Sequence, residues 1–238
     1  MTRRLKRRAA PRAWKIPRKG TKWVQRVAPG PHAQDQSLPL VLVLRDLQGI
    51  ARNAREALTL LRQGSVRVDN KVVRDLARGV GLMDTVSLAA PADQHFRVVK
   101  DRRGRLVLVP IAAADAAVKL GRVRRKTALP GGRLQVTLHD GRNLIAPGRT
   151  EWKVGDSLKV ALPGQTVAGH LPLAPGQLAY IAGGSHVGQL ARIERIEVRN
   201  SPQPNRVHFA EGFSTSKEYV FVVGSESALL PLPEGLDR

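Results

Sequence analysis

The side chains with the clearest chemistry in this sequence are its cations. Lysine and arginine together number 40 of the 238 residues, against 19 aspartates and glutamates, which gives a formal net charge of +21. These cationic groups bind phosphate oxygens, and an excess of this size repels itself unless a polyanion compensates it. We therefore expect the partner to be a nucleic acid or an anionic membrane surface. A role in solubility alone explains the charge less well.

Several patterns typical of enzymes are approached in the sequence but not completed. The stretch Gly79–Asp84 lacks the third glycine of a dinucleotide loop, and Gln189 stands where a phosphate-binding loop needs lysine. Ser185 is one residue short of the spacing of a nucleophile elbow. The histidines are isolated, and the absence of cysteine excludes disulfides and thiolate zinc sites. We predict no enzyme, catalytic residue, metal, cofactor or small-molecule substrate, although such patterns do not test sites assembled from distant residues.

The sequence also lacks the apolar segments that target a chain to a membrane. Its longest purely apolar run, Leu38–Leu44, contains Pro39 and is far shorter than the roughly 20 residues of a membrane span. The N-terminus has no apolar region of the secretory type. We therefore expect a soluble intracellular protein without a membrane partner.

Half of the excess charge lies in one N-terminal segment. Residues 1–30 contain eleven bases and no acid, so we expect this segment to be disordered on its own. Trp14 and Trp23 lie inside it, and they either stack on RNA bases or anchor the segment to its own protein. The RNA-contacting residues predicted here are Arg3, Arg4, Lys6, Arg7, Arg8, Arg12, Trp14, Lys15, Arg18, Lys19 and Lys22.

Residues 38 to about 90 have the periodicity of a small folded module. The apolar run 38–47 suits a short buried helix, with Gly49 just past its end. Asn53 and Glu56 have the spacing of a capping box, which predicts a second helix that ends at Gly64. The pattern then alternates with a period of two, which predicts strands at 65–69, 71–75 and 84–88 with a tight turn at Asp69–Asn70.

This order of elements, with the segment NAREALTLLRQGSVRVDNK (53–71), resembles the alpha-L RNA-binding module of ribosomal proteins, pseudouridine synthases and tyrosyl-tRNA synthetases. Many members of that family have glycine where Asn70 stands, but asparagine also tolerates the left-handed conformation of the turn. The resemblance implies that the exposed helix face and the hairpin bind the RNA backbone. The residues that inherit this role by position are Arg52, Arg55, Arg62, Arg67 and Lys71; a basic face exposed only to solvent is the alternative.

The middle of the chain is predicted to be rich in β-strands. Strands are expected at 106–109, 134–138 and 142–145, and a short helix at 112–120. Two basic clusters lie near strand ends, and they either contact phosphates or are exposed loop charges. The residues assigned to RNA contact in these clusters are Arg102, Arg103, Arg105, Arg124 and Arg125.

Residues 176–198 read GQLAYIAGGSHVGQLARIERIEV, in which two alternating strands flank a glycine-rich turn. The segment resembles a KOW motif, a small β-barrel element of ribosomal proteins and transcription elongation factors. The family usually places a basic residue beside the key glycine, whereas Val187 and Gln189 flank Gly188 here. This departure argues against direct RNA contact by the turn.

The whole chain resembles the archaeal and eukaryotic small-subunit ribosomal protein family S4e. The resemblance rests on RLKRRAAPRAW (4–14), GPH (30–32), GLMDTVSL (81–88), FRVVKDRRGR (96–105) and VFVVG (220–224). It implies a structural constituent of the small ribosomal subunit that binds and stabilises ribosomal RNA through phosphate contacts beside neighbouring ribosomal proteins, in the cytoplasmic ribosomes of an archaeon. The alternatives are an RNA-modifying enzyme and an RNA chaperone or transcription factor that uses the same modules.

The expected fold class is α+β with several domains. In order, these are a basic N-terminal extension (1–37), the alpha-L, or S4-like, module (38–94), a central β-rich domain (95–170), a KOW-type β-barrel segment (171–215) and a C-terminal strand and tail (216–238).

Overall fold

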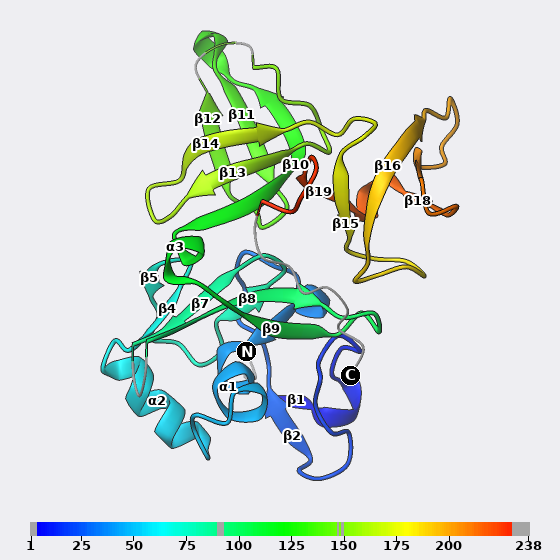
Figure 1. Cartoon of the computed structure of the whole chain (residues 1–238). Coiled ribbons are helices and arrows are strands. Elements are labelled where there is room, and N and C mark those ends of the chain that lie inside the picture. Colours follow the sequence, from blue (N-terminus) through cyan, green and yellow to red (C-terminus); the bar gives the residue numbers. More distant parts are fainter. Residues whose placement is uncertain (1–3, 90–92, 147, 149, 230–238) are drawn as a thin grey trace. The chain divides into compact units, whose positions relative to one another are not determined.

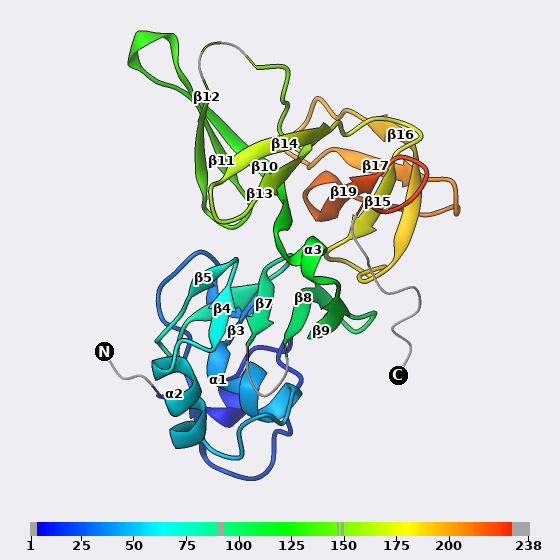
Figure 2. The ribbon, with the colours of Figure 1, turned by 60° about the vertical axis from the view of Figure 1, so that its left-hand side comes forward.

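The computed structural model describes residues 4–89, 93–146, 148 and 150–229. Strands predominate and the helices are short (Figures 1 and 2). The chain forms two compact units, one from Met1–Lys100 with Arg105–Lys119 and one from Asp101–Gly104 with Leu120–Arg238. No helix among the described residues is long and apolar enough to span a membrane.

The first unit is built on a five-stranded antiparallel sheet in the order β5-β4-β7-β8-β9. The predicted hairpin and third strand are present, and Asp69 and Asn70 turn the chain with φ angles of 50° and 60°. A boundary was expected at residues 94/95, and in the structure β8 pairs with β7 and continues the same sheet. The strands are β4 (Val66–Val68), β5 (Lys71–Val72), β7 (Thr85–Leu88), β8 (Gln94–Lys100) and β9 (Leu106–Ile111).

Two helical segments pack beside this sheet (Figure 1). The predicted first helix begins at Leu40, because Ser37–Pro39 instead forms a strand, β3, that pairs with β6 (Gly79–Gly81). It runs through α1 (Leu40–Leu42) and the π-helical turn η3 (Val43–Leu47).

The capping box that was predicted for the second helix, α2 (Ala54–Arg62), is confirmed at Asn53. The backbone N–H of Glu56 donates to Asn53 Oδ1 over 2.9 Å. The Glu56 carboxylate accepts from the N–H of Arg52 rather than from that of Asn53. The first contact satisfies a donor that the first turn of a helix leaves free, and the second ties the residue before the N-cap to the helix.

The basic N-terminal segment is folded from residue 4 onward, so the expectation of disorder is wrong for its described part. Its strands β1 (Arg4–Lys6) and β2 (Trp23–Gln25) pair with each other, and the 3-10 turns η1 (Arg7–Ala9) and η2 (Gln34–Gln36) accompany them. Apolar side chains that are scattered among the cations enter the core of the first unit: Leu5, Ala10, Trp14, Val24 and Val27. The cations therefore remain outside while a few apolar residues anchor the segment.

Trp14 is the main anchor of this segment. Its side chain is 2% exposed, and its indole N–H donates to the carbonyl oxygen of Ser37 over 2.7 Å. The segment also contacts strand β9, since the N–H of Leu106 donates to the carbonyl oxygen of Ala13. Trp23, in contrast, is 43% exposed.

Two arginines of the segment also face inward. The buried Arg7 donates to the carbonyl oxygen of Pro17 over 2.9 Å. Arg18 donates to the carbonyl oxygens of Ala10 and Pro11, and more weakly to that of Arg7. These contacts satisfy backbone acceptors in a segment that has few strand or helix hydrogen bonds of its own.

A buried ionic cluster joins distant parts of the first unit. The Lys119 ammonium donates to Asp69 over 2.9 Å and also donates to Asp84. His32 Nε2 lies 3.0 Å from Asp84, and the N–H of Thr85 donates to Asp69 over 3.0 Å. The cluster thus ties the N-terminal segment, the hairpin turn and strand β7 to the residue at which the chain leaves this unit.

Asp84 is ionised within this cluster. Burial opposes its ionisation, but Lys119, His32 and the N–H of Gly81 outweigh that effect and hold the pKa of Asp84 well below its ordinary value. The ionised carboxylate of Asp84 can accept from Lys119, from His32 and from the N–H of Gly81.

The helix that was expected at 112–120 is much shorter than predicted. The helix α3 spans only Ala113–Ala116, and strand β10 begins at Val118. Arg97, buried on β8, donates to the carbonyl oxygens of Asp115 and Val118. Burial lowers the pKa of Arg97 to about 10, so this guanidinium stays charged at neutral pH and holds the end of the helix.

The second unit contains two five-stranded sheets. The first has the order β12-β11-β10-β13-β14 and a core that includes Val136, Leu138 and Leu158. Its strands are β10 (Val118–Ala128), β11 (Leu134–Leu138), β12 (Asn143–Ala146), β13 (Ser157–Ala161) and β14 (Thr166–Leu171), with a 3-10 turn η4 (Pro130–Gly132). The strand predicted at 134–138 is confirmed to the residue.

The second sheet of this unit has the order β18-β17-β16-β15-β19, with Ile193, Val207 and Phe209 in its core. The C-terminal strand was expected in a segment of its own, and in the structure β19 pairs with β15 of this sheet. The elements are β15 (Leu178–Ile181), β16 (Leu190–Glu197), β17 (Arg206–Phe209), β18 (Ser214–Ser216), η5 (Lys217–Tyr219) and β19 (Val220–Gly224).

The substitution Asp84→Asn tests the buried cluster. We expect it to lower the free energy of unfolding by about 3–5 kcal/mol, because it leaves the buried Lys119 without one of its counter-charges. Urea denaturation followed by tryptophan fluorescence measures this change. The exposed Asp35→Asn serves as the control and should change the stability by less than about 0.5 kcal/mol. Equal effects of the two substitutions would contradict a structural role for the cluster.

The same residue predicts a dependence of stability on acid. The folded protein keeps Asp84 ionised at a pH at which the unfolded chain protonates it, so its contribution is complete above about pH 5 and is lost as the pH falls below about 4. Wild-type stability should therefore fall more steeply from pH 4 to pH 2 than that of Asp84→Asn, by up to about 1.4 kcal/mol per pH unit. If the stability of the wild type and of Asp84→Asn fell equally with pH, Asp84 would not be the source of the acid dependence.

A pair of tryptophan substitutions tests the anchoring of the N-terminal segment. Trp14→Ala should lower the free energy of unfolding by about 3–5 kcal/mol, because it opens a cavity in the core. Trp23→Ala, at a largely exposed ring, should cost no more than about 1 kcal/mol. Thermal and urea unfolding of both variants make the comparison, and a harmless Trp14→Ala would show that the segment is not anchored there.

Candidate nucleic-acid interface

The helix α2 and the β4–β5 hairpin present a row of cations in the first unit. Ala57 and Leu61 are buried on one face of α2, which turns Arg55 and Arg62 toward solvent. On β4 the neighbours Val66 and Val68 are buried, so the alternation of the strand exposes Arg67. We name the set formed by these arginines with their exposed neighbours the module cations: Arg52, Arg55, Arg62, Arg67 and Lys71.

The module cations are not used inside the protein. Within the described part of the chain, none of their side chains has a hydrogen bond or an ion pair with another residue. The hairpin beneath them is held rigidly, because its turn residue Asp69 is bound by Lys119 and Thr85. Unpaired cations on a fixed scaffold can bind phosphate oxygens without first breaking contacts of their own.

Most of the cations predicted in the N-terminal segment also face solvent. On β1, Leu5 packs against the core while Arg4 and Lys6 are exposed. Lys22 lies over the ring of Trp23, with its ammonium 5.5 Å from the ring centre. The exposed members of this set are Arg4, Lys6, Arg8, Arg12, Lys15, Lys19 and Lys22, whereas Arg3 lies outside the described residues.

Three residues of this segment that were predicted to contact RNA are engaged by other parts of the same chain instead of being fully exposed. Trp14 is enclosed in the core, and Arg7 and Arg18 donate to carbonyl oxygens of their own segment. Of the two roles that the sequence left open for Trp14, anchoring is therefore the one found. The sequence carried no local signal that separates these inward side chains from the outward ones.

The two basic clusters of the middle of the chain lie on different elements. Arg102 and Arg103 are exposed in the turn that follows β8, whereas Arg105 is half-buried. Arg124 and Arg125 are exposed on β10, where a register shift interrupts its pairing with β11. The structure thus leaves four of these five arginines accessible to a phosphate.

The turn at Gly188 is tightly packed within the second unit. Gly188 has a φ of 82°, and a Cβ there would lie 2.6 Å from the carbonyl carbon of Asp101. Glycine is required at this position by the close approach of protein backbone.

Sequence reasoning missed two groups of polar residues. His32 was noticed only as part of the GPH segment, although it completes the buried cluster with Asp84. The other group lines a hollow of the second unit and includes Arg199 and Arg206. The turn between them offers several prolines and asparagines, which signal a loop but not a site.

Family models match three consecutive parts of the chain. An RS4NT domain matches residues 1–35, an S4 domain residues 38–86 and the ribosomal family S4e residues 92–167. The S4 domain therefore covers α2 and the hairpin that carry the module cations.

Relatives and a solved structure agree with these matches over nearly the whole chain. The small ribosomal subunit protein eS4 of Methanocaldococcus jannaschii is 44% identical over 97% of both chains. The protein of the same name from Methanothermobacter thermautotrophicus is 40% identical over 97% of this chain and 96% of its own. The crystal structure of the 30S ribosomal protein S4e from Thermoplasma acidophilum is 40% identical, with a TM-score of 0.72 over 81% of this chain and 97% of that one. With the same order of modules and a similar fold, this chain belongs to the ribosomal protein S4e family.

Proposed function

We propose that the chain is a structural constituent of the small ribosomal subunit that binds ribosomal RNA through backbone phosphates. The observation that carries this proposal is the row of module cations, all exposed and none paired within the described residues. The relatives named above are small ribosomal subunit proteins, which supports the same assignment.

The N-terminal segment adds a second cationic surface to this mechanism. It was expected to become ordered only on RNA, but its described part is already packed on the first unit through Trp14. Its exposed cations therefore meet RNA as a preformed surface, and little conformational entropy is lost on binding. Recognition of this kind follows the shape of folded RNA rather than its base sequence.

The alternatives are less well supported. An RNA-modifying enzyme would need a catalytic domain after the S4 module, whereas the second unit consists of two antiparallel sheets. The chain is not an enzyme, in keeping with its relatives, which are named as ribosomal proteins. We assign the hairpin β15–β16 to a KOW-type element on its two strands and the glycine turn between them. The same proposal places the chain in cytoplasmic ribosomes, where it contacts neighbouring ribosomal proteins.

Sucrose-gradient sedimentation tests the assignment to the small subunit. A tagged copy of the chain, expressed in an archaeal host, should sediment with small subunits and remain with them at salt concentrations that remove loosely bound proteins. Recovery of the chain only from the free-protein fractions would contradict the proposal.

Substitution of the module cations tests the mode of binding. We expect Arg55→Gln and Arg67→Gln each to weaken binding of the full chain to small-subunit ribosomal RNA, and to reduce the slope of log affinity against log salt by about 0.7–0.9. Arg133→Gln, at an exposed arginine outside the proposed interface, removes the same charge and should leave the slope unchanged. Filter binding at several salt concentrations provides the slopes, and identical slopes for all three variants would remove the S4 module from the mechanism.

A further inference from the structure

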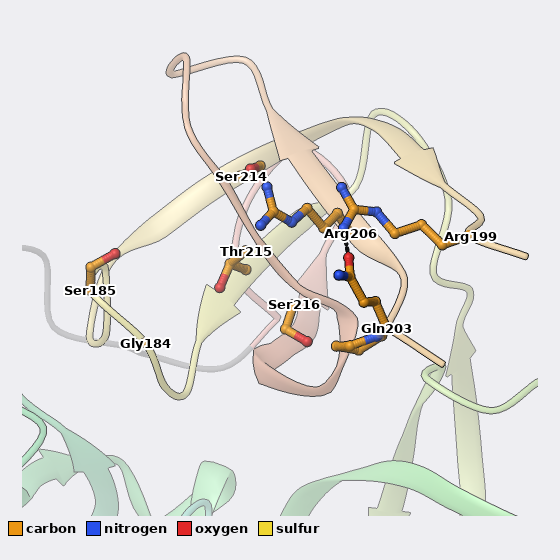
Figure 3. Close-up of a pocket in the computed structure, with 9 residues that line it drawn as sticks. Gly184, Ser185, Arg199, Gln203, Arg206, Ser214, Thr215 and Ser216 are labelled. Carbon is orange, nitrogen blue, oxygen red and sulfur yellow. Dashed lines mark hydrogen bonds between the residues drawn. The ribbon is translucent and has the colours of Figure 1, made fainter. Parts of the chain in front are cut away.

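The second unit carries a polar hollow of about 420 Å³ beside strands β17 and β18 (Figure 3). Apart from glycine and proline, every described residue that lines it ends in a hydroxyl, an amide or a guanidinium group. The residues used below are Ser185, Arg199, Gln203, Arg206, Ser214 and Thr215. A lining of this kind offers hydrogen-bond donors but no ring on which a base could stack.

Strand pairing brings these residues together. Val207 and Phe209 of β17 are buried in the core, so the alternation of the strand exposes Arg206. The chain between β16 and β17 returns Arg199 to the same place, where its backbone N–H donates to Asn205 Oδ1 over 3.0 Å. The hydroxyl residues of β18 lie alongside, since β18 pairs with β17.

The two arginines of the hollow differ in how they are held. Arg199 is fixed by Glu197 Oε1 at 2.9 Å and by Gln203 Oε1 at 2.7 Å, the latter contact being visible in Figure 3. Arg206 has no side-chain hydrogen bond or ion pair with any residue in the described part of the chain. The guanidinium of Arg199 is thus held in place, in part by the carboxylate of Glu197. The guanidinium of Arg206 is unpaired within the described residues.

Charge and geometry favour an anion with several acceptor oxygens. A guanidinium presents a planar fork of donors that matches the oxygens of a phosphate, and hydroxyl groups can complete its coordination. The ribose 2′-hydroxyl of RNA could also bind to an amide such as that of Gln203.

We propose that this hollow binds a backbone phosphate of RNA and gives the chain a second anchor, in the second unit. The proposal rests on the proposed RNA-binding function and extends it to residues outside the S4 domain. Arg206 supplies the unpaired charge, Arg199 a fixed donor, and Ser214 and Thr215 the hydroxyl donors. The site contributes affinity and orientation, because phosphate contacts carry no base sequence information.

Affinity measurements with the full chain and small-subunit ribosomal RNA test this site. Arg206→Gln should weaken binding about three- to tenfold and lower the salt slope by about 0.7–0.9. Arg206→Lys should restore the slope and part of the affinity, because it keeps the charge but not the planar fork. Arg133→Gln, which removes an exposed charge from the other sheet of the same unit, is the matched control and should bind like the wild type. Circular dichroism verifies that all variants are folded.

The outcomes separate this proposal from the function on which it depends. If the wild type binds ribosomal RNA and Arg206→Gln matches Arg133→Gln, the hollow is not an RNA anchor and the proposed function stands. If the wild type fails to bind, both proposals are overturned. The Nε–Hε resonance of Arg206, followed by NMR in the full chain, should shift with RNA and not with inorganic phosphate at a few millimolar. An equal shift with phosphate, together with unchanged RNA affinity of Arg206→Gln, would show a small-anion site instead.

Discussion

The first unit depends on one buried ammonium group. Lys119 donates to Asp69 in the hairpin turn and to Asp84 before strand β7, and Asp84 in turn contacts His32 of the N-terminal segment. Buried charges are tolerated only when they are paired and hydrogen-bonded, so each member of this cluster fixes the position of the others. The hairpin that carries exposed cations is thereby held in one geometry by charges that are buried.

The same principle explains how so basic a chain can fold. Its cations form two groups. In the first group, Arg7, Arg18 and Arg97 donate to backbone carbonyl oxygens inside the protein. The module cations remain outside without partners in the described structure. Hydrogen bonds to these carbonyl oxygens lower the cost of burying the inward guanidinium groups. In the proposed function, the outward cations gain their counter-charge from RNA phosphates.

RNA binding as proposed above has a simple physical form in each unit. The first unit offers cations on a helix and a hairpin whose positions are set by buried apolar neighbours such as Leu61 and Val66. The second unit offers donors around a hollow, fixed by strand pairing and by the contact of Arg199 with Glu197. Preorganised donors reduce the entropy that is lost on association. The chain is therefore suited to hold folded RNA in place rather than to change it chemically.

The sequence alone determined the charge, the family resemblance and the elements whose signals are local. The capping box at Asn53, the turn at Asp69–Asn70 and the strand 134–138 follow from neighbouring residues, and most of the expected cations are indeed exposed. Only the tertiary structure decided that β8 extends the first sheet, that Trp14 faces inward and that Arg199 and Arg206 share a hollow. These features arise from contacts between residues that are distant in the chain, and local periodicity carries no information about which distant surface a side chain will meet.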